Sequence, residues 1–150
     1  MNIIPASAAH LSDVRRITHE TIRTVYPRYY PQGAVDFFLA HHDESRIAQD
    51  IADGIVHLLE TDGVFAGTVT LRGNEVCRLF VLPEFQRRGF GCALMDFAEA
   101  QILATHTCIV LDASLPAKGI YLKRGYSPVE FHAIQTENGD HLCYDVMKKG

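Results

Sequence analysis

Several features that would place a protein in a membrane or on nucleic acid are missing from this sequence. No apolar run approaches the ~20 residues that a membrane-spanning helix needs. The start, residues 1–5, has no basic stretch followed by an apolar core, as a signal peptide would. The 14 Lys and Arg residues are outnumbered by 18 Asp and Glu residues, whereas nucleic-acid binders usually carry a basic surplus. We therefore expect a cytoplasmic protein that binds neither membrane nor nucleic acid.

Signals for a metal or a disulfide framework are also absent. No cysteines show the Cys-x-x-Cys spacing that binds zinc or performs redox chemistry. Each cysteine lies in or beside an apolar segment, which predicts buried, reduced thiols at Cys77, Cys92, Cys108 and Cys143. The adjacent residues His41 and His42 would point in different directions on a helix, so we expect a solvated helix break there and no metal.

The length and hydrophobic content of the chain favour one domain spanning residues 1–150. A chain of 150 residues that is 47% hydrophobic can bury one core and is too short to expect two. No repeat, low-complexity tract or linker interrupts it.

Hydrophobic spacing along the chain predicts an alternation of strands and helices. Helices are expected from Ser7 or Ser12 to about Tyr26, over residues 34–52 with a break near 42–43, from Gly89 to 102, and over 117–124. Strands are expected at residues 3–4, 55–60, 64–71, 75–82, 107–112, 126–134 and 141–147. Turn pairs such as Asp62-Gly63 and Asn138-Gly139 predict hairpins. The result is an α/β (α+β) fold with a mixed, mostly antiparallel sheet of about six or seven strands flanked by helices.

The most informative segment runs from an apolar strand through a basic, glycine-flanked turn into a helix. The apolar positions after Gly89 follow one helical face. The first amides of a helix have no partner within it and point along its dipole, so they can hold an anion. Because Gly89 and Gly91 let a ligand approach the backbone, the segment predicts a cradle for a diphosphate.

The motif in this turn, Gln86-Arg87-Arg88-Gly89-Phe90-Gly91, resembles the Gln/Arg-x-x-Gly-x-Gly/Ala signature of the GNAT superfamily of N-acetyltransferases. It lacks the third glycine of a dinucleotide fingerprint and the Gly-Lys-Ser/Thr ending of a Walker loop. The resemblance is strong over residues 74–126. It implies that acetyl-CoA is the donor, that no metal takes part, and that the two central parallel strands splay apart. Many relatives form a homodimer through the last strands, but residues 126–147 show no self-pairing signature, so the sequence leaves the oligomeric state open.

The resemblance further implies which residues contact the coenzyme. Main-chain groups of the strand before the turn would pair with pantetheine, and the amide of Val81 would polarise the thioester carbonyl. Ser114 stands where the family often has asparagine, and its shorter side chain has less reach. The full set is Leu79, Phe80, Val81, Gln86, Arg87, Arg88, Gly89, Phe90, Gly91, Cys92, Ala93, Ser114, Tyr121 and Lys123.

Two residues are candidates for acid and base. Tyr121 lies four residues before Gly125, as in the family's Tyr-x-x-x-Gly-Phe/Tyr ending, where the tyrosine sits near the coenzyme sulfur. A phenol stays protonated at neutral pH and can donate to a leaving thiolate. Glu75 opens the strand from which several family members recruit a base. The competitors for that role are Asp112, Glu130, His132, or no protein base at all.

The segment between the first two expected helices, residues 26–31, lies where the family builds its acceptor wall. Its tyrosines, Tyr26, Tyr29 and Tyr30, could hold a cationic or aromatic amine or simply pin the loop between two prolines. The sequence leaves the acceptor itself open.

We predict an enzyme that moves acetyl from acetyl-CoA to a primary amine of a small molecule or peptide, by direct transfer in a ternary complex. A covalent acetyl-Cys92 is an alternative route. The alternatives in function are a non-catalytic coenzyme A-sensing module and a nucleotide-dependent transferase.

Overall fold

The computed structural model describes all residues, Met1–Gly150. The helices are α1 (Leu11–Val25), α2 (Gln32–His41), α3 (Glu44–Ala52), α4 (Phe90–Leu103) and α5 (Lys118–Lys123). The strands are β1 (Asn2–Pro5), β2 (Val56–Thr61), β3 (Val64–Arg72), β4 (Glu75–Val81), β5 (Ile109–Ala113), β6 (Ser127–Gln135) and β7 (His141–Lys149). Short 3₁₀ turns precede α1 and follow it, and a third, Pro83–Phe85, follows β4.

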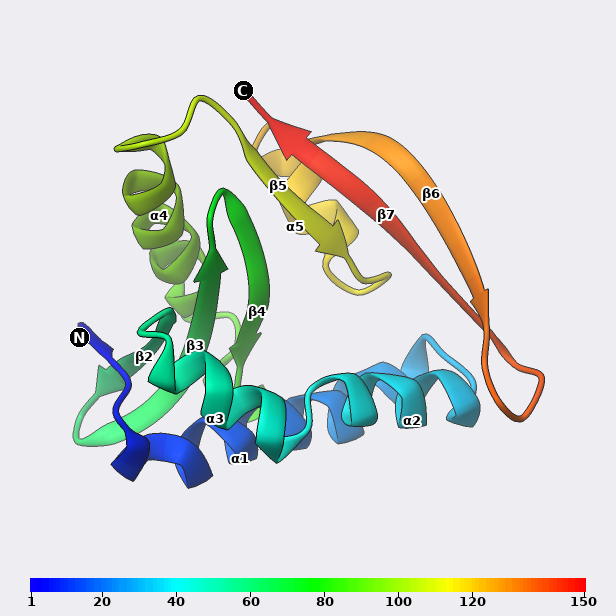
Figure 1. The fold of residues 1–150 in the computed structure, drawn as a ribbon, viewed down its shortest axis with the longest axis horizontal. Helices are drawn as coiled ribbons and strands as arrows, with labels where there is room; N and C mark the ends of the chain where they lie inside the picture. Colours follow the sequence, from blue (N-terminus) through cyan, green and yellow to red (C-terminus); the bar gives the residue numbers. More distant parts are fainter.

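The seven strands form one sheet in the order β1-β2-β3-β4-β5-β7-β6. Every neighbouring pair is antiparallel except β4 and β5, which are parallel. This confirms the predicted mixed, mostly antiparallel sheet. The parallel pair is joined only at Glu75 to Val110 and Val76 to Leu111, so the two strands separate beyond those residues (Figure 1).

Helices cover both faces of the sheet. The helices α1, α2 and α3 run along one face, and α4 and α5 lie on the other (Figure 1). Two apolar clusters correspond to these layers, one built on α1 to α3 with Leu58 and Phe80, the other on α4 with Leu111 and Met147. No helix is both long and apolar enough to cross a bilayer.

The break between the second and third helices is confirmed at His42 and Asp43. The Asp43 carboxylate accepts a hydrogen bond from the amide of Arg46 at 2.9 Å, which caps the start of α3. The expectation that this break is solvated was wrong for His42, because Phe80 and Arg78 pack against its ring. Burial and the Arg78 charge lower the pKa of His42 to about 3, so the imidazole is neutral.

The four cysteines are free, as predicted, but the expectation that they are buried was wrong, because none of them is fully buried. Cys92, in the first turn of α4, is exposed, whereas Cys77, Cys108 and Cys143 are half-buried. Cys92 is exposed because its helix turn faces an open cavity and not the sheet.

A charged cluster ties the end of the chain to α4. Glu99 accepts hydrogen bonds from Arg124 at 2.7 Å and from Tyr126 at 2.8 Å, and the ammonium of Lys149 lies 3.3 Å away. Burial alone would raise the pKa of Glu99, but the hydrogen bonds and the two cations lower it below the ordinary value.

Replacing this carboxylate, as in Glu99→Gln, is expected to cost about 2 kcal/mol of unfolding free energy at neutral pH, because Lys149 loses its carboxylate partner and Arg124 keeps only the exposed Asp96. A lowered folded-state pKa contributes stability above the unfolded value, and that stability is lost as the pH falls through the folded pKa. The gap between wild type and variant should therefore narrow below about pH 4.3. Urea unfolding at several pH values measures it, with exposed Glu20→Gln as the control. A constant gap across pH would contradict this assignment.

Candidate active site

The turn between β4 and α4 presents a run of unpartnered backbone amides. The amides of residues 87–92 donate to no acceptor in the chain, whereas the amide of Ala93 donates to the Gly89 carbonyl at 3.0 Å. Gly89 adopts a left-handed conformation with φ of 85°, and so does Arg87 with φ of 64°. Left-handed residues interspersed in such a turn aim consecutive N–H groups into one concavity, which is a nest for an anion. Six free amides at a helix N-terminus can hold a diphosphate.

The charges around this turn favour an anion. The first turn of α4 contains no acidic residue, and both Arg87 and Arg88 precede it. The guanidinium of Arg88 lies over the Phe85 ring at 5.4 Å, which leaves its charge in place beside the turn. A Cβ atom added at Gly91 would meet nothing within 4 Å, so the space in front of this amide is open.

The end of β4 exposes main-chain groups where it separates from β5. The Leu82 amide donates to the Ala66 carbonyl at 2.9 Å, so the alternation of the antiparallel ladder turns the groups of Val81 and Leu79 away from β3. On that side β5 is no longer paired. The Val81 carbonyl instead accepts from the side chains of Gln86, at 3.0 Å, and Thr21, at 3.3 Å. Gln86 and Thr21 thus both stabilise the end of β4. The role of Thr21 was not predicted from the sequence.

A cavity of about 440 Å³ opens between this turn and the splayed strands. It brings together most of the residues expected at the coenzyme: Leu79, Phe80, Val81, Gln86, Arg87, Gly89, Gly91, Cys92, Ser114 and Tyr121. Arg88, Phe90, Ala93 and Lys123 do not line it, so their expected roles stay predictions.

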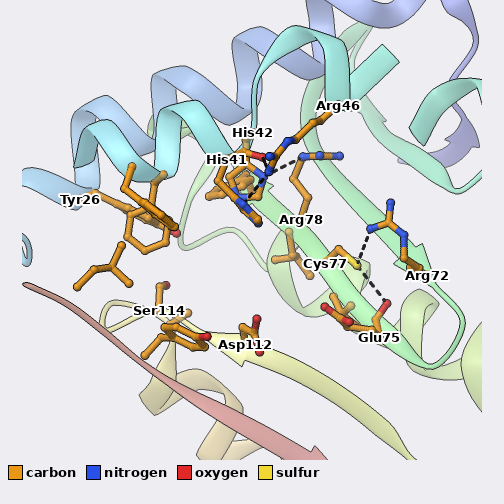
Figure 2. A pocket seen from close by; sticks show the side chains of 18 of the residues that line it. Tyr26, His41, His42, Arg46, Arg72, Glu75, Cys77, Arg78, Asp112 and Ser114 are labelled. Carbon is orange, nitrogen blue, oxygen red and sulfur yellow. Dashed lines mark hydrogen bonds between the residues drawn. The ribbon is translucent and has the colours of Figure 1, made fainter. Parts of the chain in front are cut away.

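A second cavity, of about 410 Å³, lies beside the first and is shown in Figure 2. Strand β4 contributes Glu75, β5 contributes Asp112, and the region around α2 and α3 contributes His41 and Arg46. The hairpin of β6 and β7 closes one side, because Asp140 at its tip accepts from the Gly33 amide at the start of α2, at 2.9 Å.

The two cavities meet at six residues, which line both: Tyr26, Leu79, Phe80, Ser114, Ala117 and Tyr121. Tyr121 is 8% exposed and packs edge-on against Tyr126. The Tyr126 and Tyr30 hydroxyls bond to other protein groups, whereas the Tyr121 hydroxyl has no protein partner. Burial raises the pKa of Tyr121 to about 12, so the phenol is protonated at the junction.

The three tyrosines expected at the acceptor wall have different positions. Tyr26 lines both cavities, and burial raises its pKa well above the ordinary value, with Ser114 partly offsetting the shift. Tyr30 is buried outside the cavities, where its hydroxyl accepts from the Leu115 amide at 2.7 Å. Tyr29 is 50% exposed and lines neither cavity. The structure thus brings only Tyr26 to the junction.

A buried ion pair forms the back of the second cavity. Arg78, 4% exposed, donates to Asp50 and Thr70 at 3.1 Å each and to His42 at 3.3 Å. Arg72 also bonds to the Asp50 carboxylate. All three guanidinium nitrogens of Arg78 are therefore engaged, and sequence reasoning did not identify this pair.

The candidate bases differ in their surroundings. Glu75 and Asp112 both line the second cavity. Burial raises the pKa of Asp112, with His132 and His41 opposing the shift. Glu130 and His132 line neither cavity and contact each other at 2.9 Å.

Comparison with known proteins identifies the class of protein to which this fold belongs, which is the acetyltransferases. Residues 25–146 match the family model described as an acetyltransferase (GNAT) domain. The chain belongs to the GNAT family.

Solved structures of similar fold are consistent with this assignment. A GCN5-related N-acetyltransferase from Rhodopseudomonas palustris is 23% identical, with a TM-score of 0.90 over 99% of this chain and 94% of that one. The PaiA N-acetyltransferase of Thermoplasma acidophilum, solved with coenzyme A, is 16% identical, with a TM-score of 0.73 over 99% and 97%. Arabidopsis thaliana Naa50, solved with a bisubstrate analogue, is 18% identical, with a TM-score of 0.68 over 99% and 97%. No curated protein sequence matches the chain.

Proposed function

We propose that the protein transfers the acetyl group of acetyl-CoA to a primary amine of a small molecule or peptide, directly, within a ternary complex. The observation that carries the proposal is the junction of two cavities at Tyr121, one beside six free backbone amides and the other beside carboxylates. A thiol carrier with a diphosphate fits the first cavity, and an amine fits the second.

In this proposal three residues of the chain have catalytic roles. The amide of Val81 polarises the thioester carbonyl, Glu75 takes a proton from the incoming ammonium through water, and Tyr121 donates to the sulfur. The amine nitrogen then bonds to the carbonyl carbon and the carbon–sulfur bond breaks. Tyr121 protonates the leaving thiolate, and the second amine proton passes through water to the Tyr121 phenolate. The products are an N-acetylated amine and free coenzyme A. Asp112, in the same cavity, is the competitor of Glu75 as base.

Turnover of an amine panel tests this function. We expect coenzyme A and acetyl-CoA to bind in calorimetry, and coenzyme A release to depend on an added amine. Tight coenzyme binding without acetylation of any amine would favour the sensing module. Competition of ATP or NAD with coenzyme A would favour the nucleotide-dependent transferase.

Direct transfer has its own kinetic test. Varying acetyl-CoA and amine together should give intersecting double-reciprocal lines, and protein incubated with acetyl-CoA alone should keep its mass. Parallel lines together with acetyl on the Cys92 thiol would establish a covalent route and overturn direct transfer.

A further inference from the structure

The second cavity carries charges of both signs, separated across its width. Arg46 of α3 lies across the cavity from Asp112 of β5 and Glu75 of β4 (Figure 2). A cavity built for a simple cation would not need the arginine, and one built for a simple anion would not need the two carboxylates. Only those charges that are not paired within the protein can bind a ligand.

The charges at the back of the cavity form one connected group, in which two guanidiniums share a single carboxylate and leave one net positive charge. Arg78 and Arg72 share the Asp50 carboxylate, and the remaining donors of Arg78 are held by Thr70 and His42. Breaking the buried Arg78–Asp50 pair is costly, so Arg78 is structural and does not serve a ligand, whereas the Arg72 side chain is 55% exposed and already contacts the Asp50 carboxylate.

Arg46 is the arginine of this cavity that has no carboxylate partner. Its Nη1 atom lies 2.9 Å from His41 Nδ1 and donates to the His41 carbonyl at 3.3 Å, and no carboxylate lies within 4.0 Å of it. Burial lowers the pKa of His41, and the nearby charges of Arg46 and Arg78 lower it further, so the imidazole adds no competing charge of its own. These contacts hold the guanidinium of Arg46 at the cavity wall, with its Nη2 and Nε atoms free of protein partners.

The carboxylates opposite are likewise unpaired. Neither Glu75 nor Asp112 takes part in a salt bridge, and no side-chain hydrogen bond reaches either carboxylate. Asp112 lies two residues before Ser114, which lines both cavities. The free negative charge is therefore next to the junction where acetyl transfer is proposed, and the free positive charge is farther from it.

From this charge separation we propose that the acceptor is a small amino acid-like molecule, with its amine beside Asp112 and Glu75 and a carboxylate bound by Arg46. The proposal rests on the function proposed above and names its substrate class. A cavity of about 410 Å³ has room for such a molecule. A guanidinium is well suited to a carboxylate because its planar fork can donate two parallel hydrogen bonds.

A length-matched panel of acceptors tests the proposal. β-Alanine, γ-aminobutyrate and ε-aminocaproate are each compared with the alkylamine and the diamine of the same chain length, by release of the coenzyme A thiol. We expect at least one of the amino acids to have a kcat/KM about tenfold or more above its neutral counterpart, the size expected for one charge-assisted hydrogen bond. A wild-type preference for alkylamines or diamines at every length would overturn the proposal.

Two variants at the same position sharpen the test. Arg46→Gln should lower the ratio of kcat/KM for the amino acid over its alkylamine about tenfold, and Arg46→Glu should shift preference toward the diamine. Arg23→Gln, an exposed arginine on α1 that lines neither cavity, is the matched control and should keep the wild-type ratio.

The outcomes distinguish failure of the amino acid-like acceptor from failure of the proposed acetyltransferase function. An unchanged ratio in Arg46→Gln, with active enzyme, would overturn the carboxylate assignment and leave amine acetylation standing. Binding of acetyl-CoA with no amine in the panel acetylated by wild type or any variant would overturn both.

Discussion

Replacing Gly91 with aspartate is expected to weaken coenzyme A binding by about 100-fold or more. A Cβ at this position meets nothing within 4 Å, so the fold tolerates the side chain. The new carboxylate would, however, occupy the space in front of the free amides and place a negative charge where a diphosphate must sit. Calorimetry with coenzyme A measures the loss.

The chain offers a matched control for that substitution. Gly119, in the first turn of α5, has equally open surroundings and lines neither cavity. Gly119→Asp carries the same helix change and the same charge, so it should bind coenzyme A as the wild type does. Equal losses in the two variants would show that folding or net charge, and not the cradle, explains the effect at Gly91.

Removing the Tyr121 hydroxyl, as in Tyr121→Phe, is expected to lower kcat about 100-fold while coenzyme A affinity stays within a few-fold, because proton donation in the transition state contributes about that much. The ring itself, which packs on Tyr126, is retained. Tyr126→Phe is the matched control: its hydroxyl bonds to Glu99 outside both cavities, so it should lose stability but keep kcat.

The pH profile gives a second readout of the same assignment. Burial raises the pKa of Tyr121 to about 12, and a raised pKa keeps the phenol protonated as pH rises. Tyr121 should therefore produce no alkaline loss of kcat across the range in which the protein is stable, and Tyr121→Phe should lower the profile without changing its shape. A kcat in Tyr121→Phe close to that of the wild type would contradict the acid role.

The fold was predictable because its signals are local. The apolar face after Gly89 and the glycine pair mark α4 and its start, and turn pairs such as Asn138-Gly139 mark the hairpins. The parallel β4–β5 pair followed from a crossover helix between two apolar runs. These features depend on residues close in sequence, which one chain reveals by itself.

The details of the site were less accessible because they depend on contacts between distant residues. Arg78 and Asp50 are 28 residues apart in the sequence, and Thr21 and Val81 are 60 residues apart. No local sequence pattern indicates either contact. The division among the tyrosines was equally hidden: Tyr26 and Tyr30 differ only in which partners the tertiary fold brings to them.

Two backbone details of the turn between β4 and α4 were not predicted from the sequence. Arg87 adopts a left-handed backbone conformation, which is more usual for glycine. The Ala93 amide donates to the Gly89 carbonyl and is therefore not free to bind a ligand. Neither result has a sequence signature, because both depend on how the turn closes onto the first residues of α4.

The central claim is that the free amides of residues 87–92 bind the diphosphate of coenzyme A. Backbone amide NMR of the labelled protein during titration with coenzyme A tests it most directly. The account predicts that these amide resonances show the largest shifts in the chain and that pantetheine, which lacks the diphosphate, leaves them nearly unchanged. Saturating coenzyme A with these resonances unmoved, or equal shifts with pantetheine, would contradict it.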